Sequence, residues 1–283
     1  MGFHTTPNRF IKQVRLTITN LEKSLHFYSD FLGFKVLRKT EKEADLGVEG
    51  SRAILTLLQP DGATPKEART AGLYHFAILL PSRKELGKFL LHMAKANYPL
   101  GAGDHLVSEA LYFDDPDGNG IEVYCDRPAL DWTWKGGQVE MAMNQLDAEG
   151  ILAAGKGEQW AGMPQGTVMG HIHLHVAHLS EAAEFYSKAF GYEVVSALGN
   201  QAYFLSTGRY HHHIGLNTWN GVGVPQAGRH SAGLEEFILS VTDNEDIEKI
   251  KLSLKALHAP VEMSNGYLHT SDPSGNRIAI AIQ

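Results

Sequence analysis

Residues 103–122 read GDHLVSEALYFDDPDGNGIE, in which two strand-like segments flank a tight turn, DPDG, at residues 115–118. Asp, Pro and Gly are the residue types that favour such a reversal of the chain. The resulting hairpin can place Tyr112, before the turn, and Glu122, after it, on the same face of a sheet. A buried carboxylate needs a partner, so we expect histidines from elsewhere in the chain to join Glu122 around a metal ion.

The chain contains an internal repeat. LTITNLEKSLHFYSDFLGFKV at residues 16–36 matches LHVAHLSEAAEFYSKAFGYEV at residues 174–194 at a constant offset. LYFDDPDGNGIEVY at residues 111–124 is echoed by LHTSDPSGNRIAIA at residues 268–281. Such self-similarity is what a duplication leaves behind, so the two halves are predicted to share one plan.

Each half is predicted to contain two units, and each unit is a strand, a helix and several short strands separated by turn residues. In the first unit, Leu21, Leu25, Tyr28 and Leu32 have the spacing of a helix face, and Gly33 follows as a C-cap. The units are placed at about 11–58, 73–126, 170–218 and 233–282. Their first strands are expected at 13–19, 74–80, 171–177 and 235–241, and their helices at about 20–32, 82–97, 180–190 and 243–258.

Composition limits the functional classes. With 43% hydrophobic and 20% charged residues, the 283-residue chain is expected to form a packed core in one large or two ordinary domains. A net charge of −7 provides no basic surface for nucleic acid. No apolar run approaches the roughly 20 residues of a membrane span. The single cysteine, Cys125, excludes an internal disulfide and fits a reducing compartment, so we expect a cytoplasmic protein.

A strand–helix–three-strand unit present four times resembles the vicinal oxygen chelate superfamily, which includes glyoxalase I, antibiotic-sequestering proteins and extradiol dioxygenases. Residues 103–122 closely resemble the extradiol signature, of the catechol 2,3-dioxygenase type. The resemblance implies an α+β fold in which βαβββ modules in two tandem halves pair into open β-cups. The implied domains are 9–127 and 169–283, joined by a linker at 128–168 whose second part is rich in Gly, Ala and Gln.

The family places a metal-binding histidine at the start of a unit's first strand and a glutamate in its last strand. Unit two has both, as His75 and Glu122, and unit three has His171. The histidines His173 and His175 share a strand face with His171, which leaves the choice of ligand in unit three open.

Units one and four lack the family's ligands. Gln13 and Glu236 occupy the histidine positions, and Ala279 stands where its echo has Glu122. An alanine cannot bind a cation, so these two units are predicted to be metal-free. Pairing units two and three would restore the family's site, with His75, Glu122 and His171 as a two-histidine, one-carboxylate triad. Fe(II) follows from the family's chemistry, and Mn(II) suits the same ligands.

The resemblance also assigns residues around the metal. In the run Tyr210-His211-His212-His213, the pattern implies His212 as the catalytic histidine, with His213 as the alternative; the two would face opposite ways in a strand. Unit two would contribute His105 and Tyr112, which line the substrate pocket in the family. The implied reaction is ring cleavage of a catechol by O2 to a semialdehyde. Homo-oligomers are common among related proteins.

Two other functions are consistent with parts of the sequence. A glyoxalase-like isomerase could use Gln13, His75 and Glu122, but the place for its fourth ligand, near Thr56, has no carboxylate. A metal-free binder of small aromatic compounds would keep the cups, and it would leave the conjunction of histidines, tyrosine and glutamate without a purpose.

Overall fold

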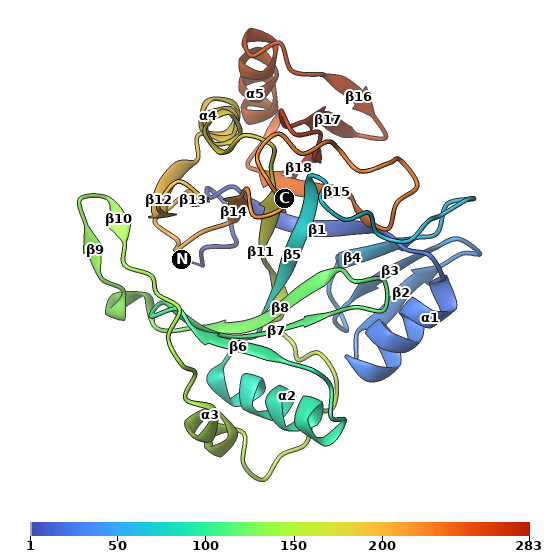
Figure 1. The fold of residues 1–283 in the computed structure, drawn as a ribbon, viewed down its shortest axis with the longest axis vertical. Helices are drawn as coiled ribbons and strands as arrows, with labels where there is room; N and C mark the ends of the chain where they lie inside the picture. Colours follow the sequence, from blue (N-terminus) through green and yellow to red (C-terminus); the bar gives the residue numbers. More distant parts are fainter. Residues whose placement is uncertain (1) are drawn as a thin grey trace.

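Each of the four units folds as a strand, a helix and three further strands in the computed structural model, which describes residues 2–283 (Figure 1). Unit one contains β1 (Phe10–Thr17), α1 (Leu21–Leu25), η1 (His26–Phe31), β2 (Lys35–Lys39), β3 (Glu43–Gly47) and β4 (Ala53–Leu58). Unit two contains β5 (Gly72–Leu79), α2 (Arg83–Lys95), β6 (Gly101–Asp104), β7 (Ser108–Asp114) and β8 (Gly120–Asp126).

The second half repeats this order. Unit three contains β11 (Val168–His175), α4 (Leu179–Phe190), β12 (Glu193–Leu198), β13 (Ala202–Ser206) and β14 (Ile214–Asn217). Unit four contains β15 (Gly233–Val241), α5 (Asn244–Ala256), β16 (Glu262–Ser264), β17 (Tyr267–Ser271) and β18 (Arg277–Ile282). The α+β class and the fourfold unit predicted from the sequence are therefore confirmed.

Both eight-stranded sheets combine units from different halves of the chain. One sheet has the order β12-β13-β14-β11-β5-β8-β7-β6 and joins units two and three; the other has the order β16-β17-β18-β15-β1-β4-β3-β2 and joins units one and four. At the centre of each sheet the first strands of the two units pair antiparallel. The pairing of units two and three, which the distribution of ligands required, is confirmed.

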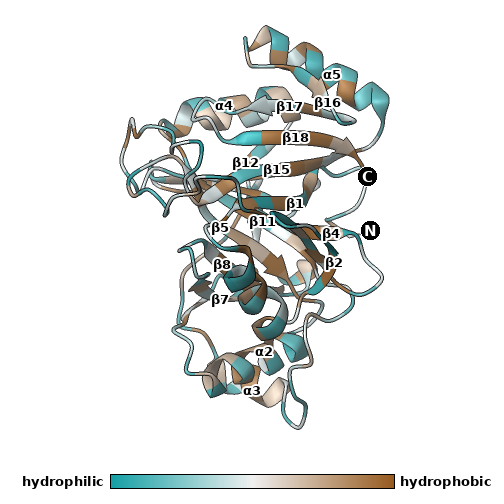
Figure 2. Cartoon of the chain, turned by 90° about the vertical axis from the view of Figure 1, so that its right-hand side faces the viewer, coloured by the Kyte–Doolittle hydropathy of each residue, from teal (hydrophilic) through white to brown (hydrophobic). Residues whose placement is uncertain are grey.

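The apolar faces of the strands pack against the helices and form the core. In β11, Ile172 and Leu174 are fully buried in the main hydrophobic cluster. Since side chains alternate along a strand, His171 and His173 project from the opposite face of the sheet. Figure 2 shows hydrophobic residues along β15 and β1, whereas α5 alternates between hydrophilic and hydrophobic positions.

A tyrosine on a helix and an aspartate in a turn join the two units of each half. The Tyr28 hydroxyl donates to the buried carboxylate of Asp115 at 2.8 Å, and Asn119 donates to the same carboxylate through its backbone and its side chain. Tyr186 and Asp272 repeat the contact in the second half, at 3.1 Å. The DPDG turn at residues 115–118 is therefore fixed by a buried hydrogen bond from the helix of the preceding unit.

The first helix differs from the single helix expected over residues 20–32. It is α-helical only over Leu21–Leu25 and continues as the π-helix η1, in which the Leu32 amide donates to the Phe27 carbonyl. A wider turn of this kind is found mostly as a single insertion in an α-helix. Gly33 follows with φ +88°, as the predicted C-cap requires.

The predicted linker has structure of its own. It contains η2 (Ala129–Asp131), the short hairpin strands β9 (Trp134–Lys135) and β10 (Gln138–Val139), and α3 (Ala148–Ala154). Helix α3 packs against α2 (Figure 1). At this contact a Cβ on Gly87 would overlap the carbonyl oxygen of Ile151, so the two helices approach as closely as a glycine allows.

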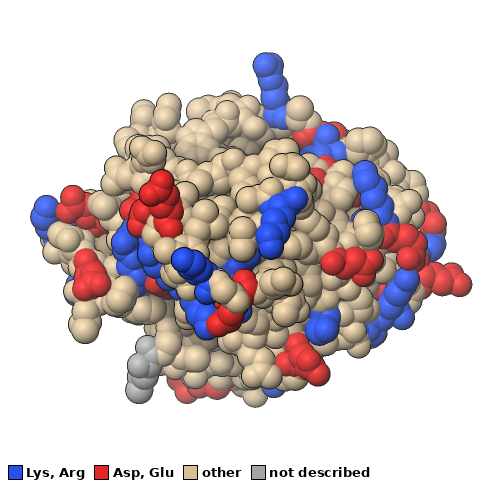
Figure 3. All heavy atoms as spheres, turned by 90° about the horizontal axis from the view of Figure 1, so that it is seen from below, with Lys and Arg blue, Asp and Glu red and all other residues tan. Residues whose placement is uncertain are grey.

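Charged residues of both signs are mixed on the face shown in Figure 3. Within residues 2–283, none of the helices has the length and apolar character needed to cross a bilayer.

We predict that Gly87→Ala destabilises the protein by roughly 1–3 kcal/mol, because the added methyl group overpacks the α2–α3 contact. In an ordinary helix the same change stabilises by up to about 1 kcal/mol. Urea unfolding gives the difference in free energy, and Ala94→Gly, at an exposed position of the same helix, sets the propensity scale. A stabilised Gly87→Ala variant would contradict the packing argument.

Candidate metal centre

The central strands of the second sheet place polar residues side by side. Cross-strand pairing creates two neighbouring rows on this sheet: Tyr112, Glu122, Ala77 and His171 in one, and Gly120, His75, His173 and Gly215 in the next. Tyr112 and Glu122 are direct partners, so the hairpin sets them on one face as the sequence predicts.

His75, Glu122 and His171 meet at one point. Their candidate ligand atoms all lie within 4.8 Å of one another. The Nε2 atoms of both histidines lie 3.0 Å from the same oxygen, Oε2 of Glu122. The three side chains are buried, with 7%, 3% and 1% of their residue surfaces exposed. Among the described residues, this is the one group with the geometry to hold a metal ion.

The donor set fits a divalent cation. Although His75 Nε2 lies 3.0 Å from the carboxylate, the contact lacks hydrogen-bond geometry, and this buried nitrogen has no other hydrogen-bond partner within residues 2–283. A buried polar atom normally has a partner, and a cation between the two histidines and Glu122 would supply one. Two imidazole nitrogens and one carboxylate oxygen suit Fe(II) and Mn(II).

The protonation states also suit a cation. Burial alone would raise the pKa of Glu122, but His171 and His75 outweigh that effect and lower the pKa well below its usual value. Burial lowers the pKa of His171 to about 4, against the opposing influence of the carboxylate. At neutral pH Glu122 is therefore ionised and His171 is neutral, which are the forms that bind metals.

A β-bulge aims His171. The register between β11 and β5 shifts between Met169 and His171, so that His171 pairs with Ala77 rather than with Phe76. Gly170 lies in the bulge, where a Cβ would overlap the Tyr124 hydroxyl. The Tyr124 ring can therefore pack beside His171, with 5.0 Å between ring centroids.

His212 is the member of the histidine run that reaches the metal centre. Its ring lies 4.0 Å from that of His171, and it lines the adjacent cavity. Its Nδ1 is 2.9 Å from Nδ1 of His211, whose Nε2 is 2.8 Å from Asp126. Because the carboxylate only accepts, His211 donates from Nε2 and accepts at Nδ1. His212 then donates from Nδ1, and its Nε2 carries the lone pair.

His213, the alternative, turns away from the centre: its Nδ1 is 3.2 Å from Ser206 Oγ and its Nε2 is 3.2 Å from the Phe3 carbonyl. The expectation that these histidines alternate within a strand was wrong, because the run precedes β14 and lies in a bend. Three successive rings that contact Asp126, the cavity and Phe3 need three different directions, which a strand does not provide.

His105 and Tyr112 form a hydrogen-bonded pair at the cavity. His105 donates from Nδ1 to the Ala142 carbonyl at 2.9 Å, so its Nε2 accepts from the Tyr112 hydroxyl at 2.5 Å. Burial, together with the nearby Glu122 carboxylate, raises the pKa of Tyr112 well above its usual value. Tyr112 therefore remains a neutral phenol.

The cavity at this centre has a volume of about 240 Å³ and mostly apolar walls. Sequence reasoning did not find several of its wall residues, which are Tyr74, Met141, Met143, Phe204 and Trp219. The two methionines belong to the predicted linker, and no pattern in that segment signals a pocket. The lining contains no lysine or arginine.

The corresponding positions in the other sheet form no metal site. Gln13 donates to Thr56 at 2.6 Å, and the Glu236 carboxylate accepts from Arg15 at 2.8 Å. Gln13 lies in β1, in a different sheet from His75 and Glu122, so the alternative site that used all three is contradicted. Among the described residues, the group of converging ligand atoms comes from units two and three.

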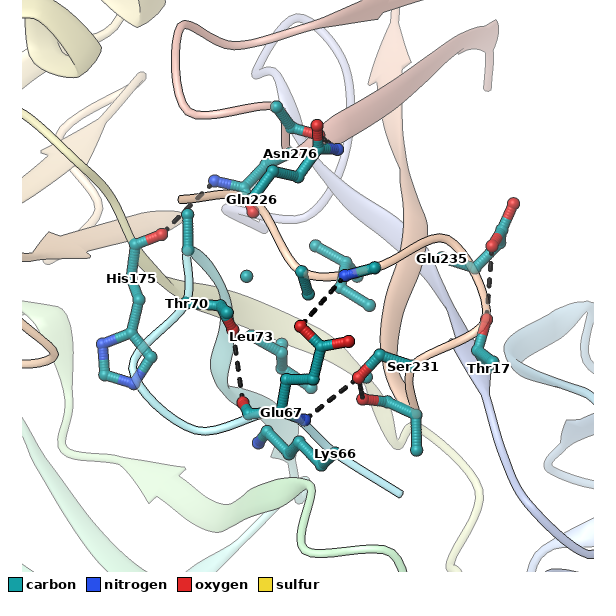
Figure 4. Close-up of a pocket in the computed structure, with 18 of the residues that line it drawn as sticks. Thr17, Lys66, Glu67, Thr70, Leu73, His175, Gln226, Ser231, Glu235 and Asn276 are labelled. Atoms are coloured by element: carbon teal, nitrogen blue, oxygen red, sulfur yellow. Dashed lines mark hydrogen bonds between the residues drawn. The ribbon is translucent and has the colours of Figure 1, made fainter. Parts of the chain in front are cut away.

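A larger cavity, of about 490 Å³, lies where the first strands of units two and four begin (Figure 4). Many of its polar groups bond to one another: the Glu67 amide donates to Ser231 Oγ at 3.1 Å, and Thr17 donates to Glu235 at 3.2 Å. It contains no group of metal ligands among the described residues. The candidate metal ligands belong to the smaller cavity instead: His75 and Glu122 line it.

The model of the Glyoxalase/Bleomycin resistance protein/Dioxygenase superfamily matches residues 10–123 and 168–280. The chain belongs to this superfamily. Over 276 residues it is 41% identical to the Catechol-2,3-dioxygenase of Bacillus subtilis (strain 168), covering 96% of this chain and 97% of that protein.

Solved structures of the superfamily fold are similar at low sequence identity. Glyoxalase I from Zea mays aligns with a TM-score of 0.60 at 15% identity, covering 96% of this chain and 92% of that one. The cppA protein from Streptococcus pneumoniae TIGR4 aligns with a TM-score of 0.56 at 11% identity, covering 98% and 100%. These likenesses concern the fold alone.

We predict that His171→Ala abolishes the binding of one divalent ion per chain, because it removes one of three converging donors. Metal analysis after anaerobic loading with Fe(II) or Mn(II) and gel filtration measures the stoichiometry. His175→Ala is the matched control, since His175 lies on the same strand but is 2.7 Å from Asn217 Oδ1. Binding that survives in His171→Ala and is lost in the control would assign the ligand to His175.

We predict that the metal-free protein loses stability as the pH falls from about 6.5 to 4. Burial lowers the pKa of six histidines that the folded protein keeps neutral: His4, His171, His173, His175, His212 and His213. The unfolded chain takes up protons below about pH 6.5 and the folded chain does not, so protonation favours unfolding. For His171, with a pKa of about 4, the effect is about 3 kcal/mol.

Two buried aspartates act in the opposite direction, because burial raises the pKa of Asp115 and Asp272. Six histidines outweigh two aspartates over this range. Urea unfolding of chelator-treated protein at several pH values measures the slope, and a free energy of unfolding that is constant or rises toward pH 4 would contradict the prediction.

Proposed function

We propose that the protein is a catechol 2,3-dioxygenase-type extradiol dioxygenase, which inserts O2 into a catechol beside its two hydroxyls and releases a ring-opened semialdehyde. The observation that carries the proposal is the convergence of His75, Glu122 and His171 at a cavity that also presents His212 and the His105–Tyr112 pair. The 41% identity to a protein named Catechol-2,3-dioxygenase supports it.

Fe(II) is the proposed metal and Mn(II) the alternative, held by His75, Glu122 and His171. When bound, such an ion supplies Lewis acidity toward the diol and a redox path between the diol and O2. One carboxylate and two neutral imidazoles neutralise only one of its two charges. An anionic catecholate is therefore a favourable further ligand.

His212 is the proposed base for the diol. The chain of hydrogen bonds from Asp126 through His211 fixes the tautomer of His212 with the Nε2 lone pair free toward the cavity. A group in this state accepts a proton from a substrate hydroxyl and returns it later in the reaction. His211 and Asp126 thus orient the base through hydrogen bonds rather than touching the substrate.

Tyr112 and His105 are proposed to hold the substrate oxygens. Tyr112 remains protonated. Its hydroxyl donates to His105, and its side chain lies on the sheet face that also carries Glu122. It can therefore donate to an anionic substrate oxygen, while His105 Nε2 accepts from a neutral hydroxyl once Tyr112 has turned to the substrate.

The cavity indicates a substrate of one ring. Its volume of about 240 Å³ lies below the range of about 300–1,000 Å³ usual for drug-sized ligands. Its mostly apolar walls exclude water from the aromatic ring, and they strengthen the polar contacts at the diol end. A cytoplasmic location, consistent with the single buried thiol of Cys125, and a homo-oligomeric state remain predictions.

The proposal is tested by loading the protein with Fe(II) without oxygen, adding catechol and then admitting air. We expect a yellow ring-opened product and uptake of one O2 per catechol. The His171→Ala variant should show neither. Tight metal binding without oxygen uptake would refute the dioxygenase and favour an isomerase.

We predict that His212→Phe retains the metal and lowers the kcat for catechol by roughly 10²–10⁴-fold, the usual contribution of a general base. Phenylalanine keeps the ring that packs on His171 and removes the proton acceptor. Rate measurements with matched metal content test this, and a kcat within a factor of two of wild type would remove His212 from the mechanism.

A further inference from the structure

His173 is a second histidine of β11 that faces the cavity, and it has no assigned task. It is 3% exposed and lines the same cavity as His75 and Glu122. Its Nε2 is buried and has no hydrogen-bond partner anywhere in residues 2–283. It also falls outside the group of converging metal ligands.

The surroundings hold this ring in place. A Cβ on Gly215 would lie only 2.7 Å from Cγ of His173, so the ring rests on a position that only glycine fits. The rings of Tyr74 and Trp219 lie 5.0 and 5.4 Å away, and that of Phe204 lies 5.7 Å away. The histidine is thus packed among aromatic groups, none of which gives it a hydrogen bond.

The duplicated sheet provides an internal comparison. Arg15 occupies the position of His173 in the repeat and faces Glu236, which occupies the position of His75. In that sheet the Arg15 guanidinium donates to the Glu236 carboxylate on the paired strand, at 2.8 Å. At His173 the residue across the ladder is His75, which is turned to Glu122. The missing partner must come from outside the chain.

A buried nitrogen left without a partner weakens binding by roughly 5- to 100-fold relative to one that is satisfied. A site with such a nitrogen therefore discriminates against ligands that cannot form a hydrogen bond with it. Because the lining contains no lysine or arginine, and Glu122 is its one acidic residue, a carboxylate on the ring would find no cationic side chain there. A small, uncharged polar group on the ligand could form a hydrogen bond with His173 and would need no cationic partner.

We propose that His173 recognises a substituent on the ring of the bound catechol. It forms a hydrogen bond with a small, neutral polar group, such as a hydroxyl, methoxy or hydroxymethyl. This inference rests on the proposed function, which it deepens by naming the substrate class. Catechols with an alkyl group or a carboxylate at that place are poorer substrates. His173 is thereby a specificity residue that leaves the chemical step to the residues around the metal.

The test uses two ligands of equal size, 3-methoxycatechol and 3-ethylcatechol, with 2,3-dihydroxybenzoate as the charged case. Dissociation constants are measured by calorimetry on metal-loaded protein without oxygen, and kcat/KM is measured in air. We expect wild type to favour the methoxy compound by about tenfold in both measurements. In His173→Phe the preference should fall to about one.

Two further variants separate a lost hydrogen bond from a damaged fold. His173→Gln keeps a donor and an acceptor and should restore part of the preference. His175→Phe introduces the same ring two residues along the strand, outside the smaller cavity, and should leave the preference as in wild type. Thermal unfolding of each variant is measured alongside.

A wild type without preference for the methoxy compound, or an equal preference in His173→Phe, would overturn the proposal. So would a raised KM for O2 in His173→Phe with the preference intact, since His173 would then face dioxygen. If wild type binds both catechols and cleaves neither, the proposed function fails, and the ratio of dissociation constants still decides the role of His173.

Discussion

The antiparallel ladder between β5 and β11 is the interaction on which the rest of this protein depends. It joins strands about one hundred residues apart, and it brings His75 and Glu122 of one half to His171 of the other. Neither half contains a complete set of ligands. The candidate metal centre is consequently assembled across the two halves of the chain, and losing the ladder would separate its ligands as well as the sheet.

The two sheets solve the same electrostatic problem in different ways. Each buries a glutamate on its polar face, and a buried carboxylate is costly unless a positive or donating partner is near. In the sheet of units one and four, the Arg15 guanidinium binds Glu236. In the sheet of units two and three, His75 and His171 lie against Glu122, and the three side chains form a group that could hold a metal ion. The chain itself supplies the charged partner of Glu236, whereas the group around Glu122 could take a bound cation as its partner.

The cavity at the candidate metal centre combines anchored polar residues with mainly apolar walls. Hydrogen bonds anchor His212 from one side, through His211 to Asp126, and the Ala142 carbonyl anchors His105 from the other. Between them the walls are mainly aromatic and aliphatic. Under the proposed function, such a cavity would orient a flat diol at its polar end, and few polar groups would be left to contact the rest of the ring.

The sequence by itself determined the four units, the lack of the family's ligands in units one and four, and the candidate trio His75, Glu122 and His171. These follow from local alternation, from turn chemistry and from comparison of the repeats, all of which are written along the chain. Tertiary structure alone decided the π-helical turn at His26–Phe31, the bend that points His212 inward, and the contribution of linker residues to the cavity wall. Each of these depends on which distant group a side chain meets, and that is fixed by sheet register and packing rather than by neighbours in sequence.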